Sequence, residues 1–178
     1  HPQSSTLDQS MTSLSVFDLF KIGIGPSSSH TVGPMRAAKS FLEKLAGCCK
    51  VGQVAEVRCL LHGSLGSTGK GHGSDRAVIL GLMGESPDTV DIESIADRLY
   101  CLQQTRKLAL GLGLGEIGFD SSSHIIFLTK PLEAHPNGLQ FLAYDHAGVE
   151  LLSATYLSVG GGFIRSVELD SVLQTTSS

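Results

Sequence analysis

Two short polar segments hold most of the side chains in this chain that could perform chemistry. The first, Ser27–Thr31, reads Ser-Ser-Ser-His-Thr and directly precedes a helical pattern. Hydroxyls and free backbone N–H groups at the positive end of a helix are suited to holding a small anion. Simple N-capping would need only one hydroxyl, and this alternative stays open. Because four hydroxyls and an imidazole exceed a cap, we predict that a small anion binds to Ser27, Ser28, Ser29, His30 and Thr31.

The second segment is the glycine-rich stretch from Gly63 to Asp75. It places Lys70 and His72 two residues apart, each between glycines. An ammonium group can hold a carboxylate as a point charge, and an imidazole can take or give a proton near neutral pH. A solvated lysine and a surface histidine are the plainer alternative. The framing by glycines favours a functional role for both.

The glycines resemble nucleotide-binding motifs only superficially. A P-loop around Gly69-Lys70 would need glycine at position 64, where this chain has Ser64. The dinucleotide fingerprint fails because Ser28 and Ser74 stand where its third glycine is required. Ser67-Thr-Gly-Lys70 matches S-x-x-K, but it lacks the partner motifs of that enzyme class. Nucleotide binding and serine-hydrolase chemistry are therefore disfavoured.

The elements that must position these segments follow from hydrophobic periodicity. Helical spacing runs from Met35 to a stop at Gly47, and Gly-Leu repeats over 110–115 suggest a loop that leads into an extended segment. Ser74 or Asp75 is expected to cap the helix that follows the second polar segment. The sequence predicts a single α+β domain whose mostly antiparallel sheet carries helices on one face. Further helices are expected over 76–83 and 92–102, and strands over 54–61, 125–128, 139–144 and 151–159, with a hairpin turn at 145–148.

Composition excludes several classes of partner and bounds the domain. The formal net charge is −4, and no run of basic residues could neutralise a nucleic-acid backbone. No apolar stretch reaches the length that crosses a bilayer. The four cysteines lack metal-ligand spacing, which predicts a reducing compartment, the cytoplasm. Residues 1–12 are interpreted as a disordered leader or cloning remnant, 13–168 as the domain and 169–178 as a flexible tail.

The remaining histidines favour structural roles. His62 ends a predicted strand and is expected to be structural, whereas His124 and His146 lie in apparent turns and are expected to be solvated. His135-Pro-Asn-Gly138 is typical of a turn in which Asn-Gly adopts positive φ. The run Gly160–Gly162 predicts tight backbone packing or close approach to another surface.

A resemblance to a known family covers roughly residues 14–166. Ser15–Phe20 with Gly23–Met35, then Gly63-Ser-Leu with Thr68–Asp75, then Asn137-Gly, and finally Tyr156–Ile164 resemble the N-terminal β portion of bacterial iron–sulfur-dependent L-serine dehydratases. The one departure noted, Ser74 where relatives often carry threonine, keeps a hydroxyl. The resemblance also extends in fold to the allosteric substrate-binding domain of some phosphoglycerate dehydrogenases.

The resemblance implies a reaction and assigns different roles to the α and β portions of the enzyme. L-serine would lose water and then ammonia to give pyruvate, without pyridoxal phosphate. A [4Fe–4S] cluster with one open iron site would assist, held by cysteines of a separate α portion for which this chain's four cysteines do not substitute. This β portion alone would be inactive, and the whole enzyme is expected to be a homodimer. Serine or threonine preference stays open.

By the same resemblance, His72 is the expected base or proton shuttle, and Lys70 supports it. The residues expected to bind the substrate or order its site are Ser27, Ser28, Ser29, His30, Thr31, Ser64 and Asn137. The alternative is a regulatory module that binds serine or a small anion without catalysis.

Overall fold

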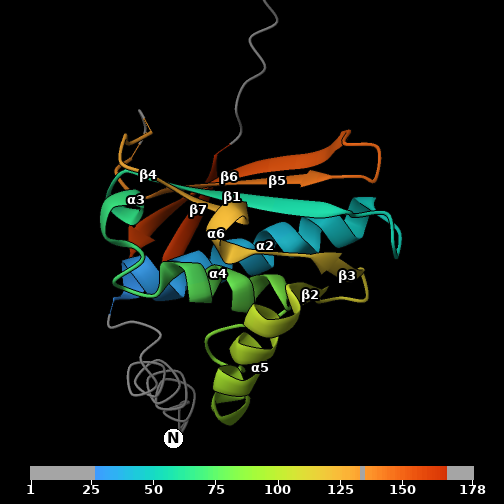
Figure 1. The fold of residues 1–178 in the computed structure, drawn as a ribbon. Coiled ribbons are helices and arrows are strands. Elements are labelled where there is room, and N and C mark those ends of the chain that lie inside the picture. Colours follow the sequence, from blue (N-terminus) through green and yellow to red (C-terminus); the bar gives the residue numbers. More distant parts are fainter. Residues whose placement is uncertain (1–26, 133–134, 168–178) are drawn as a thin grey trace, which may run out of the picture.

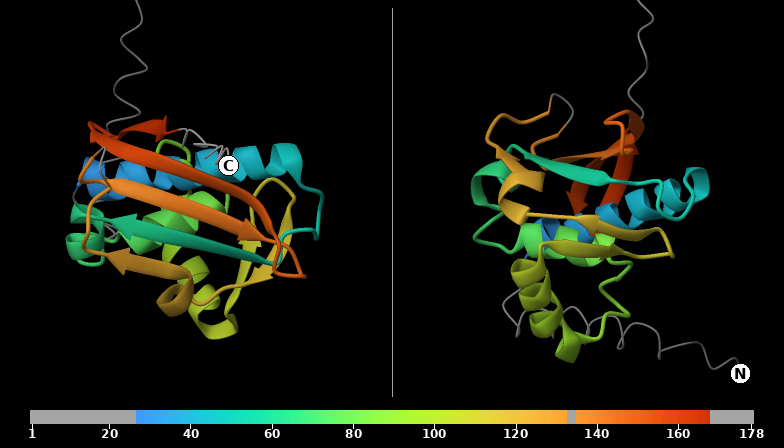
Figure 2. Two further views of the ribbon diagram at one scale, coloured as in Figure 1. Left: turned by 90° about the horizontal axis from the view of Figure 1, so that it is seen from above. Right: turned by 45° about the vertical axis from the view of Figure 1, so that its right-hand side comes forward.

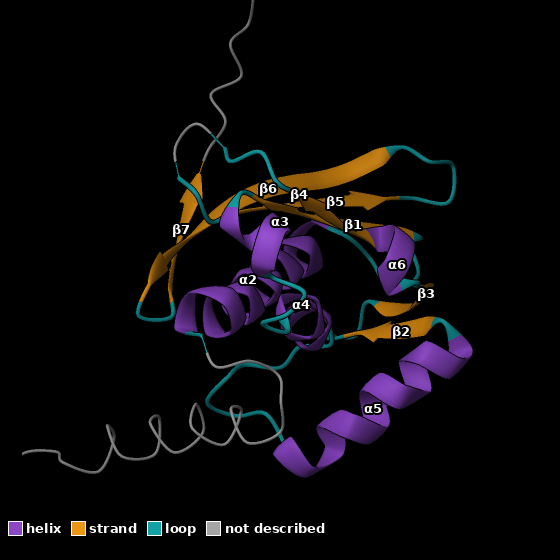
Figure 3. Cartoon of the chain, turned by 60° about the vertical axis from the view of Figure 1, so that its left-hand side comes forward, coloured by secondary structure: helices purple, strands orange, loops and turns teal. Residues whose placement is uncertain are grey.

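The computed structural model describes residues 27–132 and 135–167. A five-stranded sheet forms one layer, and helices α2 and α4 pack beneath it (Figure 1). Helix α5 lies on the far side of these helices from the sheet, at the periphery (Figure 3). The helical elements are η1 Ser28–Val32, α2 Gly33–Cys48, α3 Ser64–Thr68, α4 Ser74–Leu82, α5 Ile92–Thr105 and α6 Ser121–His124. The strands are β1 Glu56–His62, β2 Lys107–Leu110, β3 Gly115–Gly118, β4 Ile125–Leu128, β5 Gly138–Tyr144, β6 Glu150–Gly160 and β7 Phe163–Val167.

The sheet has the strand order β4-β1-β5-β6-β7 (Figure 2). Strands β1, β5, β6 and β7 pair antiparallel, and β4 pairs parallel with β1 at one edge. The β5–β6 hairpin turns where the Gly148 N–H donates to the Asp145 carbonyl, as the sequence predicts. The α+β class with a mostly antiparallel sheet is therefore confirmed.

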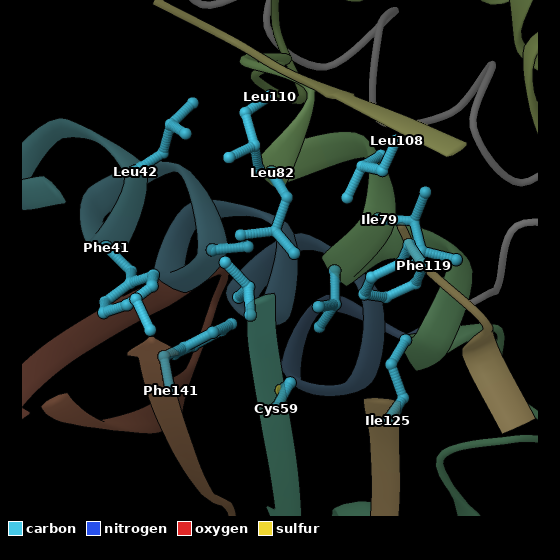
Figure 4. Packing of buried hydrophobic residues seen from close by; sticks show 14 of the residues in the cluster. Phe41, Leu42, Cys59, Ile79, Leu82, Leu108, Leu110, Phe119, Ile125 and Phe141 are labelled. Carbon is cyan, nitrogen blue, oxygen red and sulfur yellow. The ribbon is translucent and has the colours of Figure 1, made fainter. Parts of the chain in front are cut away.

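The core lies between the inner face of the sheet and α2. Along β5, Leu139, Phe141 and Ala143 are fully buried and alternate with half-buried residues, as a strand with one covered face requires. The ring of Phe41 on α2 stacks on Phe141, with 5.1 Å between the ring centroids (Figure 4). Tyr156 on β6 meets Phe141 edge-on at 5.9 Å. Aromatic packing thus fixes α2 across the middle of the sheet.

A glycine lets α4 pack closely against α2. A Cβ at Gly81 would lie 2.4 Å from the Met35 carbonyl oxygen and 2.6 Å from Ala38 Cβ. Both helices must separate if a side chain is placed there, because real Cβ atoms do not approach backbone so closely. This contact joins the beginning of α2 to the end of α4 and sets how closely the two helices pack.

Several local expectations are wrong. The Gly-Leu repeats do form a loop that leads into an extended segment, β3, as expected, but the β2 strand before them and its pairing with β3 were not predicted; in this turn Leu112 adopts the left-handed conformation at φ 58°. The first polar segment does not simply precede a helix: it forms η1, a π-helical turn that is continuous with α2. Part of the second segment is helical as α3, and α4 is preceded by Gly73 without a side-chain cap from Ser74 or Asp75.

Some expectations cannot be compared with the structure. The proposed leader, the tail and the stretch from Ser15 to Gly25 that carries part of the resemblance lie outside the described residues. Within 27–132 and 135–167, no helix is both long enough and apolar enough to cross a bilayer.

Candidate functional site

The first polar segment is shaped by a π-helical turn that leads into α2. The Gly33 N–H donates to the Ser28 carbonyl, and the Thr31 N–H donates to the Ser27 carbonyl at 2.9 Å. Such wide turns are rare and occur often at functional sites. Because the turn runs into α2, the backbone of His30 is held by the helix that the core fixes.

The second polar segment begins where β1 ends. Gly63 has φ 62°, and a Cβ there would lie 2.2 Å from the Pro136 carbonyl oxygen. Only glycine fits this crossing without displacement of the neighbouring chain. The Ser64 N–H then donates to that same carbonyl at 2.9 Å. The end of β1 is thereby tied to the residue that precedes Asn137.

The two polar segments converge through side chains. His30 Nε2 lies 3.0 Å from Ser64 Oγ. The Thr31 hydroxyl donates to the His72 carbonyl at 3.1 Å, and the Ser74 hydroxyl donates to the His30 carbonyl. The rings of His30 and His72 lie 4.9 Å apart between centroids. These contacts bring the two polar segments together at one place.

Burial and the neighbouring His72 shift the protonation of His30, whose ring also contacts nearby hydroxyls. Its Nδ1 lies 2.8 Å from Ser29 Oγ, which in turn lies 3.0 Å from Ser27 Oγ. Burial lowers the pKa of His30, the nearby His72 lowers it further, and a hydrogen bond to Ser64 partly opposes both. His30 is therefore held toward its neutral form, in which one ring nitrogen accepts and the other donates.

Two buried polar atoms near the convergence have no partner. His72 Nδ1 and Asn137 Oδ1 are buried and lack hydrogen bonds in the described part of the chain. A buried polar atom left unpaired costs about 1–3 kcal/mol, so native proteins rarely keep one without a reason. Both atoms are therefore free to accept or donate a further hydrogen bond.

Among the predicted site residues, Lys70 is the one whose side chain is least involved in the cluster. Its side chain is exposed, and no hydrogen bond or ion pair joins it to another residue within the described ranges. Ser28 and Asn137 are each half-buried, but hydrogen bonds to the histidine pair are recorded for neither side chain. The roles of these three residues stay predictions.

The sequence reasoning did not identify Ser158. This buried β6 residue donates from its hydroxyl to the Ser29 carbonyl at 2.7 Å. A Cβ at Gly33 would lie 2.1 Å from Ser158 Oγ, so this glycine makes room for the contact. Arg36 reaches the Gly162 carbonyl at 2.7 Å, and the close approach predicted for the triple glycine is confirmed.

The other histidines lie away from this cluster. His62 Nε2 lies 3.0 Å from Gln140 Oε1, which confirms a structural role. The prediction that His124 is solvated is wrong, because its ring stacks on Phe119 and its Nε2 lies 3.2 Å from Glu56 Oε1. Neither Asn137 nor Gly138 has positive φ, so the expected Asn-Gly turn geometry is also wrong.

A cavity of about 630 Å³ lies beside the cluster and not within it. Its lining comes from α4, α5 and the residues that lead to α6, and it includes neither His30, Ser64 nor His72. Asp75, near the beginning of α4, is its nearest link in sequence to the histidine pair. The cluster itself is a polar corner whose residues His30, Ser64 and His72 are each half-buried.

Comparisons with known proteins decide the family. A family described as serine dehydratase beta chain matches residues 15–168. The chain belongs to the serine dehydratase beta chain family. An L-serine dehydratase of Streptomyces coelicolor is 51% identical over 89% of this chain and 34% of its own length. An L-serine dehydratase of Haemophilus influenzae is 44% identical over 85% of this chain and 33% of its own length. L-serine dehydratase 1 of Escherichia coli is 45% identical over 87% of this chain and 34% of its own length.

This beta chain therefore spans about a third of the length of the curated relatives it matches. The matched residues include both polar segments and the triple glycine that packs against η1.

The described part of the beta chain does not fit an iron–sulfur cluster. It contains no group of three or more histidine, cysteine, aspartate or glutamate side chains that could hold a metal ion. Cys59 is fully buried in the core, and burial raises its pKa. Cys101 lies on α5, whereas Cys48 and Cys49 lie at the end of α2. A cluster would need ligands from elsewhere.

Proposed function

We propose that this chain supplies substrate-binding and proton-transfer groups to an L-serine ammonia-lyase, which converts L-serine to pyruvate and ammonia. One observation carries the proposal: the rings of His30 and His72 lie 4.9 Å apart, and the buried Nδ1 of His72 has no partner among the described residues. The family and its L-serine dehydratase relatives provide the substrate class.

Hydroxyls and amides would hold the substrate. The carboxylate of serine is an acceptor for several hydrogen bonds, and the Ser27–Thr31 segment and Ser64 offer hydroxyl donors around His30. Asn137 would add its unsatisfied amide oxygen as an acceptor for the substrate ammonium group. Exposed Lys70 would close over the carboxylate as a point charge once the site is complete.

Proton transfer would be the task of His72. The Cα proton of serine is weakly acidic, so its removal needs a base that is positioned within hydrogen-bond reach. His72 is half-buried and its ring lies beside that of His30, whose pKa is lowered. A neutral neighbour neither repels a protonated imidazole nor competes for the substrate as a charge. His72 would accept the proton and return it to the departing groups.

The portion that lies outside this chain would complete the site. The [4Fe–4S] cluster implied by the resemblance would be held there and would assist departure of the hydroxyl as a Lewis acid. The incomplete hydrogen bonding of the polar corner supports a partner surface at this position. The proposal also includes that the whole enzyme is a homodimer, that it lies in the cytoplasm and that it works without pyridoxal phosphate.

Replacement of His72 tests the proposal in the whole enzyme. His72→Ala should lower kcat by about 10²–10⁴-fold, the usual contribution of a general acid or base. The cluster absorbance and the folded state should not change. His146→Ala is the matched control, because His146 is exposed and bonds only to the Gly52 carbonyl among the described residues. Near-normal kcat in His72→Ala would overturn the assignment.

The same variant separates catalysis from regulation. The hydroxyl cluster around His30 would also suit a module that senses serine or a small anion. In that case His72→Ala would leave kcat unchanged and shift only the serine concentration at half-maximal rate. A loss of kcat with a retained serine-binding signal supports catalysis.

A further inference from the structure

Two adjacent cysteines lie at the opposite end of α2 from the histidine pair. Cys48 is the last residue of the helix, and Cys49 follows in an extended conformation. Their Sγ atoms lie 3.5 Å apart. Cys48 is exposed, and Cys49 is partly buried against the core. The proposed serine chemistry uses neither thiol.

The separation of the sulfurs suits a bridging atom better than a direct bond. A disulfide requires the sulfurs to approach to about 2.05 Å, which would force a rearrangement of this helix end. Two thiolates at about 2.3 Å from one tetrahedral zinc lie roughly 3.8 Å apart. The observed 3.5 Å is close to that second geometry. One atom bonded to both sulfurs would fit with little movement.

The atom that bridges the two sulfurs must be one that needs only two protein ligands. Among the described residues no third histidine, cysteine, aspartate or glutamate joins the pair to form a metal site. A tetrahedral ion would therefore remain open to competing ligands. Trivalent arsenic that already carries one carbon substituent needs only two more bonds. This valence matches the two thiols.

The acidity of the pair also favours chelation over single-thiol chemistry. Burial, followed by the hydrogen bond and the charge of Cys48, raises the pKa of Cys49 to about 11. Cys49 is thus a poor thiolate nucleophile at neutral pH. Condensation with an arsenic(III) oxide starts from two thiols: two As–S bonds form, the As–O bond breaks, and both thiol protons leave with that oxygen as water. No oxidant is required.

We propose that Cys48 and Cys49 form a dithiol site that captures monosubstituted trivalent arsenicals. The second As–S bond forms within the complex, so the pair should bind far more tightly than either thiol alone. Linked contacts of this kind gain about 10²–10⁴-fold. The site is independent of the serine chemistry and would make the chain sensitive to this class of thiol reagent.

Phenylarsine oxide tests the site on the full 178-residue chain. One equivalent should bind per chain, add the mass of the reagent less one water, and remove two titratable thiols. Ethanedithiol should reverse the adduct, whereas an equal excess of a monothiol should not. No uptake by the native chain, or loss of only one thiol, would overturn the proposal.

Single substitutions locate the binding. Cys48→Ser and Cys49→Ser should each weaken binding by about 100-fold or more, because each leaves one sulfur. Cys101→Ser is the matched control, since Cys101 is an exposed cysteine on α5 with no neighbouring thiol among the described cysteines, and it should bind normally. Circular dichroism checks that each variant is folded. Retained tight binding in either of the first two variants would contradict the site.

Discussion

Helix α2 connects a packed apolar region with a polar region, and the two differ in how fully their groups are paired. In its middle, Phe41 is fully buried and stacks on Phe141, and the chain supplies all the contacts for that packing. At its beginning, η1 meets a polar corner where His72 Nδ1 and Asn137 Oδ1 are buried without partners. The first region is fully packed, whereas polar atoms of the second are left without partners among the described residues. A packed core therefore positions a polar corner.

The largest expected effect on folding is in the apolar region. Phe141→Ala should lower the free energy of unfolding by about 3–5 kcal/mol, because it removes a fully buried ring and leaves a cavity under α2. Urea denaturation measures the change. Val149→Ala is the control, since Val149 is exposed in the β5–β6 turn and should change stability by no more than about 0.5 kcal/mol. Equal effects of both substitutions would show that Phe141 does not lie in the core.

A smaller effect is expected where the two regions meet. Ser158→Ala removes the hydroxyl that donates to the Ser29 carbonyl and should cost about 1–3 kcal/mol of stability. Because this bond fixes the backbone beside His30, the variant should also raise KM for serine in the whole enzyme. Ser153→Ala on the same strand is the control, since its side chain is exposed. Unchanged KM would show that η1 holds its shape without β6.

A substitution in the polar corner should affect stability in the opposite sense to one in the core. Asn137→Leu replaces a buried, unpaired amide oxygen by an apolar group of similar size, so stability should stay constant or rise by about 1 kcal/mol. Serine binding by the whole enzyme should nevertheless fall. Tyr156→Phe is the matched control, because it also removes a buried unpaired polar atom but within the core. Loss of stability in Asn137→Leu would mean that its amide already has a structural role.

The difference between the apolar core and the polar corner also explains what could be predicted from sequence. Strands such as Ile125–Leu128 and helices such as Ile92–Thr105 follow local hydrophobic spacing, and these predictions are confirmed. The β2–β3 hairpin was missed because its turn requires Leu112 in a left-handed conformation, which leucine rarely adopts.

The site was predictable only in part, for a related reason. Its segments were visible as unusual polar runs between glycines, but the contact between Ser158 and Ser29 joins residues 129 positions apart and leaves no local signal. The π-helical form of Ser28–Val32 was also missed, because hydroxyl-rich residues before a helix indicate a cap and not a wider turn. Tertiary contacts decide both features.

The smallest expected effect is the pH dependence that His30 gives to folding. The pKa of His30 is lowered in the folded chain, chiefly by burial and then by His72, so below its ordinary value near 6.5 the unfolded chain binds more protons than the folded chain. Stability should therefore fall as pH drops below that value, and level off once pH passes below the lowered pKa. His30→Gln keeps a hydrogen-bonding side chain without the titration and should flatten this part of the curve, as measured by urea denaturation between pH 5 and pH 8. His146→Gln, at an exposed position, should leave the curve unchanged. An unaltered slope in His30→Gln would show that the polar corner does not exclude the charged imidazole, and the neutral His30 required beside His72 would lose its support.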